Sequence, residues 1–137
     1  MSVRRKARET ALQTLYRLDI AEEAETEAGG DEVDGLAPGT EARRYCEALI
    51  GGIKARRAEL DSTIESSSDN WTIDRMAVVD RNVLRIAAYE LLYCPDTPPK
   101  AVIDEAIELA KKYGSDESGA FINGILDRVL KVKIRGA

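Results

Sequence analysis

The chain has 137 residues, of which 44% are hydrophobic and 33% are charged, and its formal net charge is -5. This length and composition are typical of one soluble globular domain. The absence of histidine excludes catalysis and metal binding through imidazole, and Cys46 and Cys94 form no CxxC pair. The sequence also lacks a P-loop, a GxGxxG motif and any long apolar segment. We therefore expect a cytoplasmic protein without a metal, a cofactor or a membrane span.

Helical patterns fill the first half of the chain on both sides of one acidic segment. Apolar residues recur at helical spacing from Val3 to Ile20, which predicts an amphipathic helix with a basic beginning. Residues 22–41 contain eight acids, no base, four glycines and a proline, a composition that predicts an exposed loop. Thr40 is expected to cap a second helix over residues 41–64.

The second half of the chain predicts a run of helices with short connections. A short helix is expected to begin near Trp71, and a wide apolar stripe over residues 78–93 predicts a central helix. Pro99 is placed in the first turn of the next helix and Gly114 at its end, before a last helix. Because no segment alternates like a strand, the predicted fold class is all-α, a compact helical bundle.

The acidic net charge is unevenly distributed along the chain. Residues 22–41 carry a net charge of -8, so the remaining residues sum to +3. The residues outside this segment are mildly basic overall, so the net charge of the whole chain does not exclude nucleic-acid binding through one face. Such binding should weaken as salt is added.

A cluster of cations at the first helix is the principal candidate site for phosphate groups. Arg4, Arg5, Lys6 and Arg8 lie within five residues, and guanidinium groups bind phosphate through two parallel hydrogen bonds. Tyr16 follows two turns later and could continue the same surface. A solvated helix end that only aids solubility is the alternative explanation.

Two residues near the start of the last helix could contact bases. The ring of Phe121 could stack on an unpaired base, and the amide of Asn123 could pair with a base edge. The alternative is that both aromatic residues, Tyr16 and Phe121, belong to the core, and the core is favoured for Phe121 because it lies beside the apolar stripe of its helix.

Four sequence blocks in the same order resemble the NusB transcription antitermination factor family. They are RRKARETALQTLY (4–16), VLRIAAYELLY (83–93), PPKAVIDEAIELAKKYGSDES (98–118) and FINGILDRVL (121–130). The resemblance implies a single domain, 1–137, of about seven helices. These helices would form two packed helical subdomains, about 1–66 and 67–137, with the acidic loop in the first.

The resemblance also implies a function without catalysis. Proteins similar to this one bind the boxA element of RNA as a heterodimer with NusE, a small-subunit ribosomal protein. The complex joins RNA polymerase and promotes read-through of terminators, notably in ribosomal RNA transcription. The implied RNA-binding residues are Arg4, Arg5, Lys6, Arg8, Tyr16, Glu117, Phe121 and Asn123. Asp80 and Arg85 fall in the helix expected near the partner protein and RNA.

Two alternatives remain open from the sequence. The chain could be a helical protein-interaction module that binds no RNA, or a homodimer that hides the basic helix end. The acidic loop is expected to screen the basic helix end or to compete with RNA for it.

Overall fold

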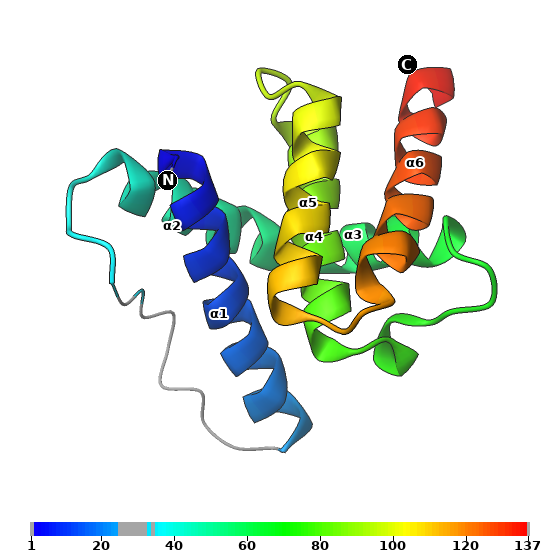
Figure 1. Cartoon of the computed structure of the whole chain (residues 1–137), viewed down its shortest axis with the longest axis horizontal. Coiled ribbons are helices and arrows are strands. Elements are labelled where there is room, and N and C mark those ends of the chain that lie inside the picture. Colours follow the sequence, from blue (N-terminus) through cyan, green and yellow to red (C-terminus); the bar gives the residue numbers. More distant parts are fainter. Residues whose placement is uncertain (1, 25–32, 34, 137) are drawn as a thin grey trace. The chain divides into compact units, whose positions relative to one another are not determined.

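The computed structural model describes residues 2–24, 33 and 35–136, with side chains up to residue 133. All secondary-structure elements of the described part are helices, which confirms the predicted all-α class (Figure 1). In chain order the elements are α1 (Val3–Glu23), α2 (Glu41–Ala55), α3 (Arg57–Ser66), the 3-10 helix η1 (Ile73–Arg75), α4 (Val78–Tyr93), α5 (Pro99–Tyr113) and α6 (Ser118–Gly136). The chain divides into two compact units, residues 1–55 and 56–137.

The first unit is a pair of helices, α1 and α2, that pack on each other. Their apolar stripes are buried, as at Ala11 on α1 and Ile53 on α2. The hydroxyl of Thr40 accepts a hydrogen bond from the backbone N–H of Arg43 at 3.2 Å, so the predicted cap is present. Between the helices, residues 25–32 and 34 of the predicted acidic loop lie outside the described residues.

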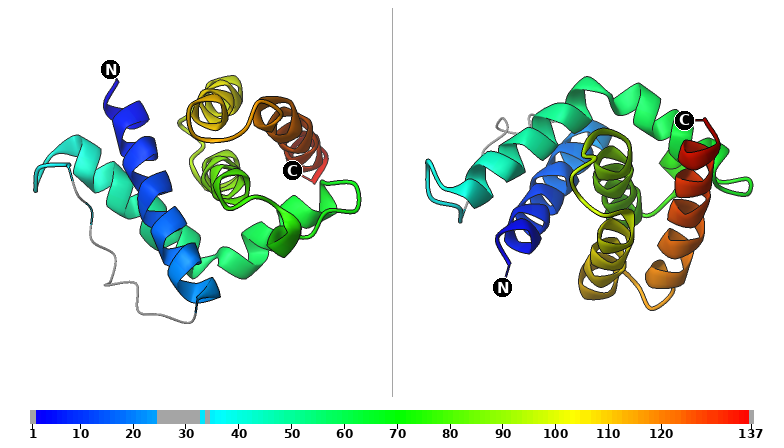
Figure 2. Two further views of the ribbon diagram at one scale, coloured as in Figure 1. Left: turned by 60° about the horizontal axis from the view of Figure 1, so that its bottom comes forward. Right: turned by 90° about the horizontal axis from the view of Figure 1, so that it is seen from above.

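The second unit is built around α4, as its wide apolar stripe predicts. The left view of Figure 2 looks almost along α4, α5 and α6, which lie side by side, and each of the three contacts the other two. Residues 80–88 of α4 are all buried, because α3 also packs against this helix. Gly114 ends α5 as expected, and its backbone N–H donates to the carbonyl of Ala110.

One predicted helix is divided in the structure. The backbone of Arg56 (φ -118°, ψ 19°) separates α2 from α3 within the expected helix over residues 41–64. Because α3 packs on α4, α6 and η1, it belongs to the second unit. The division between units therefore falls after Ala55, earlier than the expected division near residue 66.

None of the helices in the described part is long and apolar enough to cross a membrane.

Candidate nucleic-acid interface

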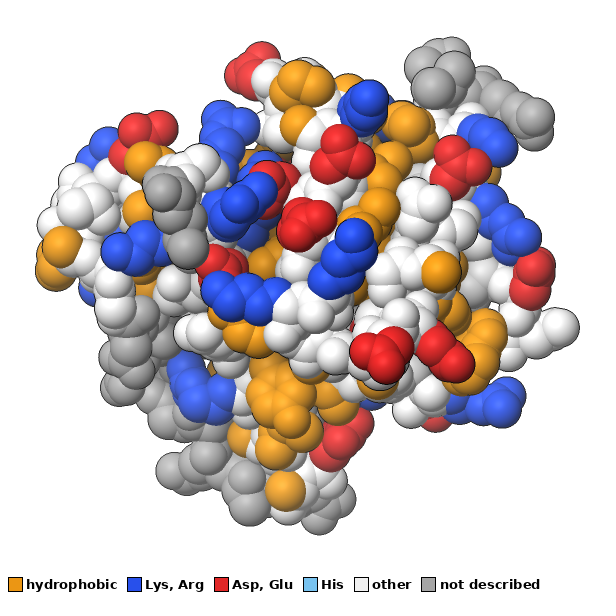
Figure 3. Space-filling model, viewed as in Figure 1, with side chains coloured by type: hydrophobic (Ala, Val, Ile, Leu, Met, Phe, Trp, Pro, Cys, Tyr) orange, Lys and Arg blue, Asp and Glu red, His pale blue; other side chains and the backbone are white. Residues whose placement is uncertain are grey.

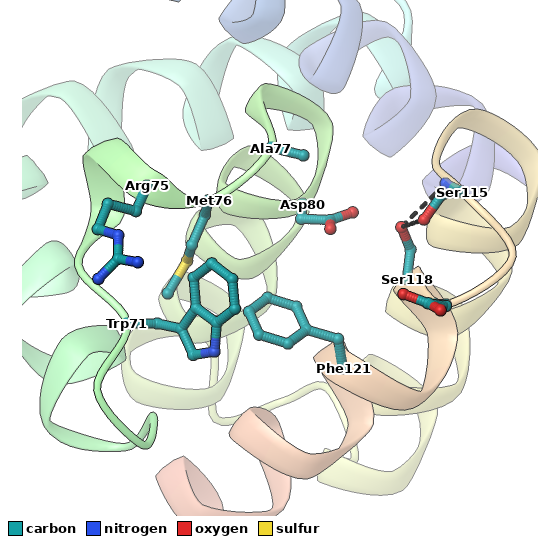
Figure 4. A pocket seen from close by; sticks show the side chains of 9 residues that line it. Trp71, Arg75, Met76, Ala77, Asp80, Ser115, Ser118 and Phe121 are labelled. Atoms are coloured by element: carbon teal, nitrogen blue, oxygen red, sulfur yellow. Dashed lines mark hydrogen bonds between the residues drawn. The ribbon is translucent and has the colours of Figure 1, made fainter.

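A pocket in the second unit gathers residues from three separate stretches of the chain. They come from η1 and its flanks, from the start of α4, and from the turn that joins α5 to α6 (Figure 4). The pocket has a volume of about 230 Å³. Sites for drug-sized ligands usually have about 300–1,000 Å³, so this pocket suits a smaller group such as one flat ring. Its lining residues are Trp71, Arg75, Met76, Ala77, Asp80, Ser115, Glu117, Ser118 and Phe121.

Two aromatic rings form one wall of this pocket. The centroids of Trp71 and Phe121 lie 5.6 Å apart, with an interplanar angle of 75°. This edge-to-face geometry is a favoured arrangement of aromatic pairs. The guanidinium carbon of Arg75 lies 5.6 Å from the centre of the Trp71 ring. Trp71 is 42% exposed, so an apolar surface is available beside a cation.

Asp80 supplies an acceptor with unused capacity. It lies in the first turn of α4 and lines the pocket, with only 9% of its surface exposed. Its Oδ1 atom has no hydrogen-bond partner among the described residues. Buried polar atoms are normally hydrogen-bonded, and an unpaired one has a free-energy cost. A ligand that donates a hydrogen bond at this point would remove that cost.

The turn between α5 and α6 is held by a small hydrogen-bond network. The Oγ atom of Ser118, a residue only 2% exposed, accepts a hydrogen bond from the backbone N–H of Ser115 at 3.0 Å. A Cβ atom at Gly114 would lie 2.5 Å from that Oγ, so only glycine leaves room for the network. The network fixes the first turn of α6, and with it the direction of Glu117 and Phe121.

The basic cluster at α1 lies in the first unit and is exposed in part. Arg4, Arg5 and Lys6 are exposed, whereas Arg8 is only 5% exposed. The guanidinium carbon of Arg4 lies 4.8 Å from the centre of the Tyr45 ring, a cation–π contact that restrains it. Tyr16, further along α1, is 42% exposed. Three cations and one aromatic side chain are thus exposed on this helix.

The candidate residues divide between the two units, and each group is described within its own unit. In the second unit, Glu117, Phe121 and Asp80 line the same pocket, while Asn123 is exposed on α6 and does not line it. Arg85 is only 2% exposed and binds within the unit. Because it is buried, Arg85 has a structural role. That Arg85 contacts a partner protein stays a prediction.

Sequence reasoning did not identify Trp71 or Arg75 as site residues. Trp71 was expected only to begin a short helix, because its contact with Phe121 spans fifty positions of the chain. One signal was available in the sequence, since the chain's single tryptophan stands four residues before a cation.

Charge in the second unit is mixed. On the face shown in Figure 3, acidic and basic side chains are interspersed over α5 and α6. The guanidinium of Arg128 on α6 lies 2.9 Å from the carboxylate of Asp69. The hydrogen bond and the charge of Arg128 hold the pKa of Asp69 below its usual range.

In the described part of the chain, no cluster of three or more acidic or thiol side chains could hold a metal ion.

Comparison with known proteins gives consistent matches over nearly the whole chain. The model of the NusB family matches residues 5–131. A transcription antitermination protein NusB from Anaeromyxobacter sp. (strain Fw109-5) is 51% identical and covers 94% of this chain and 91% of its own. The corresponding protein from Elusimicrobium minutum is 48% identical, with 99% of each chain covered.

Solved structures agree with these matches. A structure of NusB from T. maritima superposes with a TM-score of 0.83 at 38% identity, covering 93% of this chain and 90% of that chain. A chain from a crystal structure of the antitermination factors NusB and NusE in complex with double-stranded RNA gives a TM-score of 0.76 at 29% identity. That alignment covers 96% of this chain and 98% of the other.

Proposed function

Because the chain belongs to the NusB family, we propose that it is an RNA-binding transcription antitermination factor that binds boxA RNA together with NusE. In this role it joins the RNA polymerase antitermination complex in the cytoplasm and promotes read-through, notably in ribosomal RNA transcription. The curated relatives are named transcription antitermination proteins rather than enzymes, and this function requires no catalytic residue.

The observation that carries the proposal is the pocket shared by Asp80, Glu117 and Phe121. A single unpaired base is a flat ring with a π-face and hydrogen-bonding edges. The ring of Phe121 offers it an apolar wall, and the free Oδ1 of Asp80 offers an acceptor. Carboxylate oxygens accept hydrogen bonds from the amino groups of bases, so the pocket favours a base that carries one.

The first unit offers its own candidate contacts to RNA, the exposed cations of α1. Arg4, Arg5 and Lys6 can neutralise phosphates, which positions RNA without reading its sequence. Tyr16 adds an exposed ring on the same helix, and Asn123 adds an exposed amide on α6. Arg8 is not counted among the cations of α1 that could contact RNA, because it is buried.

A partner protein would compensate for the low RNA affinity expected of this chain alone. Few cations are exposed at α1, and the whole chain has a net charge of -5, which opposes RNA binding at long range. A second protein that binds both this chain and RNA raises the apparent affinity through linked equilibria. A chain that superposes on this one was solved with NusE and RNA, which supports NusE as that partner.

Fluorescence anisotropy of labelled boxA RNA, with and without NusE, tests the proposal. We expect NusE to tighten binding, and Arg5→Ala combined with Lys6→Ala to weaken it. Loss of two phosphate contacts should reduce the slope of log K against log salt by about one per cation. The matched control is Arg44→Ala with Lys54→Ala, which removes two exposed cations of α2 in the same unit.

Equal losses in both double variants would show that only total charge matters and would contradict the assigned surface. If the protein binds NusE but no RNA at low salt, the chain is a protein-interaction module instead. Light scattering of the free protein identifies a homodimer, the other arrangement that would hide this surface.

A further inference from the structure

A second pocket in the same unit shares Trp71 and Phe121 with the first. It has a volume of about 190 Å³, and its other lining residues are Ser68, Asp69, Gly124, Ile125 and Arg128. The Trp71–Phe121 pair therefore borders two pockets of similar size, and the predicted residues Asp80 and Glu117 line only the first.

We propose that this second pocket is a nucleotide subsite, in which an unpaired RNA base stacks on Trp71 and its phosphate binds Arg128. This inference rests on the proposed RNA-binding function and extends it by one nucleotide. The two pockets would take neighbouring bases, because both are bordered by the same pair of rings.

The chemistry of Trp71 suits a stacking platform. It is 42% exposed although it is the largest apolar side chain in the protein, and its ring contacts Phe121 edge to face. Bases of any sequence stack on such a ring, since every base has a π-face. The cation of Arg75 beside the ring adds attraction for the RNA backbone.

The chemistry of Arg128 suits a phosphate. Its side chain is 50% exposed, and it contacts the Asp69 carboxylate at 2.9 Å and the Ser67 carbonyl oxygen at 3.4 Å. A guanidinium group has five N–H donors in a planar fork, so donors remain for a further anion. The ion pair with Asp69 therefore orients Arg128 at the pocket without using all of its hydrogen-bonding capacity.

Gly124 keeps the pocket open. A Cβ atom added at this position would meet no atom within 4 Å, so the space beside α6 is unfilled. A leucine here would occupy the pocket without a steric conflict at its Cβ. Gly51 on α2 is a matched control, because its Cβ position is equally open and it lies in the other unit.

The single tryptophan of the chain makes the subsite directly observable. Titration with single-stranded boxA RNA should quench the fluorescence of Trp71, with the same Kd as anisotropy gives. Inorganic polyphosphate, which carries phosphates but no bases, should compete for the cations without the same quenching. Gly124→Leu should reduce the quenching, leaving only what a base in the first pocket causes, and should weaken RNA binding about fivefold or more, the loss expected for one stacked base. Gly51→Leu should behave as the unmodified protein.

The RNA affinities of Trp71→Phe and Trp71→Ala give a second measurement, one that does not depend on tryptophan fluorescence. Phenylalanine retains a stacking face, so we expect near-normal RNA affinity for Trp71→Phe and a loss for Trp71→Ala, both with native circular dichroism.

The results separate this inference from the function on which it rests. If RNA raises the anisotropy but leaves Trp71 unquenched, and Gly124→Leu binds normally, the second subsite is wrong and the RNA-binding function stands. Quenching by polyphosphate as strong as that by RNA would also overturn the subsite. If no RNA binds by either measurement, both proposals fail.

Discussion

The guanidinium of Arg85 on α4 binds both carboxylate oxygens of Asp61 on α3, with its Nε at 2.7 Å and one terminal nitrogen at 3.0 Å. The other terminal nitrogen donates to Asn82 at 3.1 Å. Arg85 is almost fully buried, whereas Asp61 is partly exposed. Two parallel hydrogen bonds of this kind are strong and directional, so this pair fixes α3 on the central helix.

Replacing Arg85 by alanine should therefore destabilise the protein. Breaking a buried ion pair from one side costs about 3–5 kcal/mol, and we expect about 3 because Asp61 retains some contact with water. Urea denaturation followed by circular dichroism measures the change. Arg57→Ala is the control, since Arg57 contacts the same carboxylate at 3.8 Å from a more exposed position. Its cost should stay under about 1 kcal/mol; equal costs would refute the structural role of Arg85.

Gly114→Ala should loosen the turn that positions Glu117 and Phe121. The new Cβ would lie 2.5 Å from Ser118 Oγ and 2.8 Å from the carbonyl oxygen of Ala110, so the turn must shift. We expect a loss of about 1–3 kcal/mol in unfolding free energy and weaker RNA binding. Gly51→Ala should instead stabilise the protein by about 0.5–1 kcal/mol, because its Cβ position is open. A melting temperature unchanged by Gly114→Ala would contradict this account of the turn.

Cys46 should be the slower of the two cysteines to react with thiol reagents. Burial, followed by the charge of Glu47, raises the pKa of the Cys46 thiol from 9.0 to about 11. At pH 8 this leaves about 100-fold less of the reactive thiolate than an unshifted thiol would have. Cys94 is partly exposed and serves as the comparison. Ellman's reagent measures the reaction rate of each cysteine in the folded variant that lacks the other cysteine. Equal rates for Cys46 and Cys94 would contradict the predicted protection of Cys46.

The same pKa shift predicts a loss of stability at alkaline pH. The folded state holds the Cys46 proton to about pH 11, whereas an unshifted thiol releases it near pH 9.0. Between these values the folded state binds more protons than the unfolded state, so the free energy of unfolding falls as pH rises. Comparison with Cys46→Ala isolates this contribution, because the variant should show a shallower decline. If the free energy of unfolding falls equally steeply with pH in the unmodified protein and in Cys46→Ala, other groups cause the pH dependence.

Neutralising the acidic segment should tighten RNA binding. Glu25, Glu27, Asp31 and Glu32 together contribute four negative charges to a segment with no base. Their replacement by Gln or Asn removes repulsion from RNA and competition for the cations of α1. We expect a higher affinity at low salt and no difference near 0.5 M, about where screening becomes strong. An unchanged or lower affinity at low salt would show that the segment does not compete with RNA.

The local features of this protein could be predicted from its sequence. Helical spacing, the cap at Thr40 and the stop at Gly114 each depend on residues within one or two turns, and all three occur in the structure. The all-α class followed from the same local patterns. The candidate residues Glu117 and Phe121 were also indicated, because they stand in two recognisable blocks on either side of a helix start.

Only the tertiary structure decided which charged and aromatic side chains are available. Arg4 and Arg8 share one helical face by spacing, yet Arg4 is exposed and Arg8 is buried. Trp71 meets Phe121 from fifty positions away, and both residues line the two pockets. Helix formation depends on hydrogen bonds between near neighbours in the chain, whereas burial depends on distant segments that pack together.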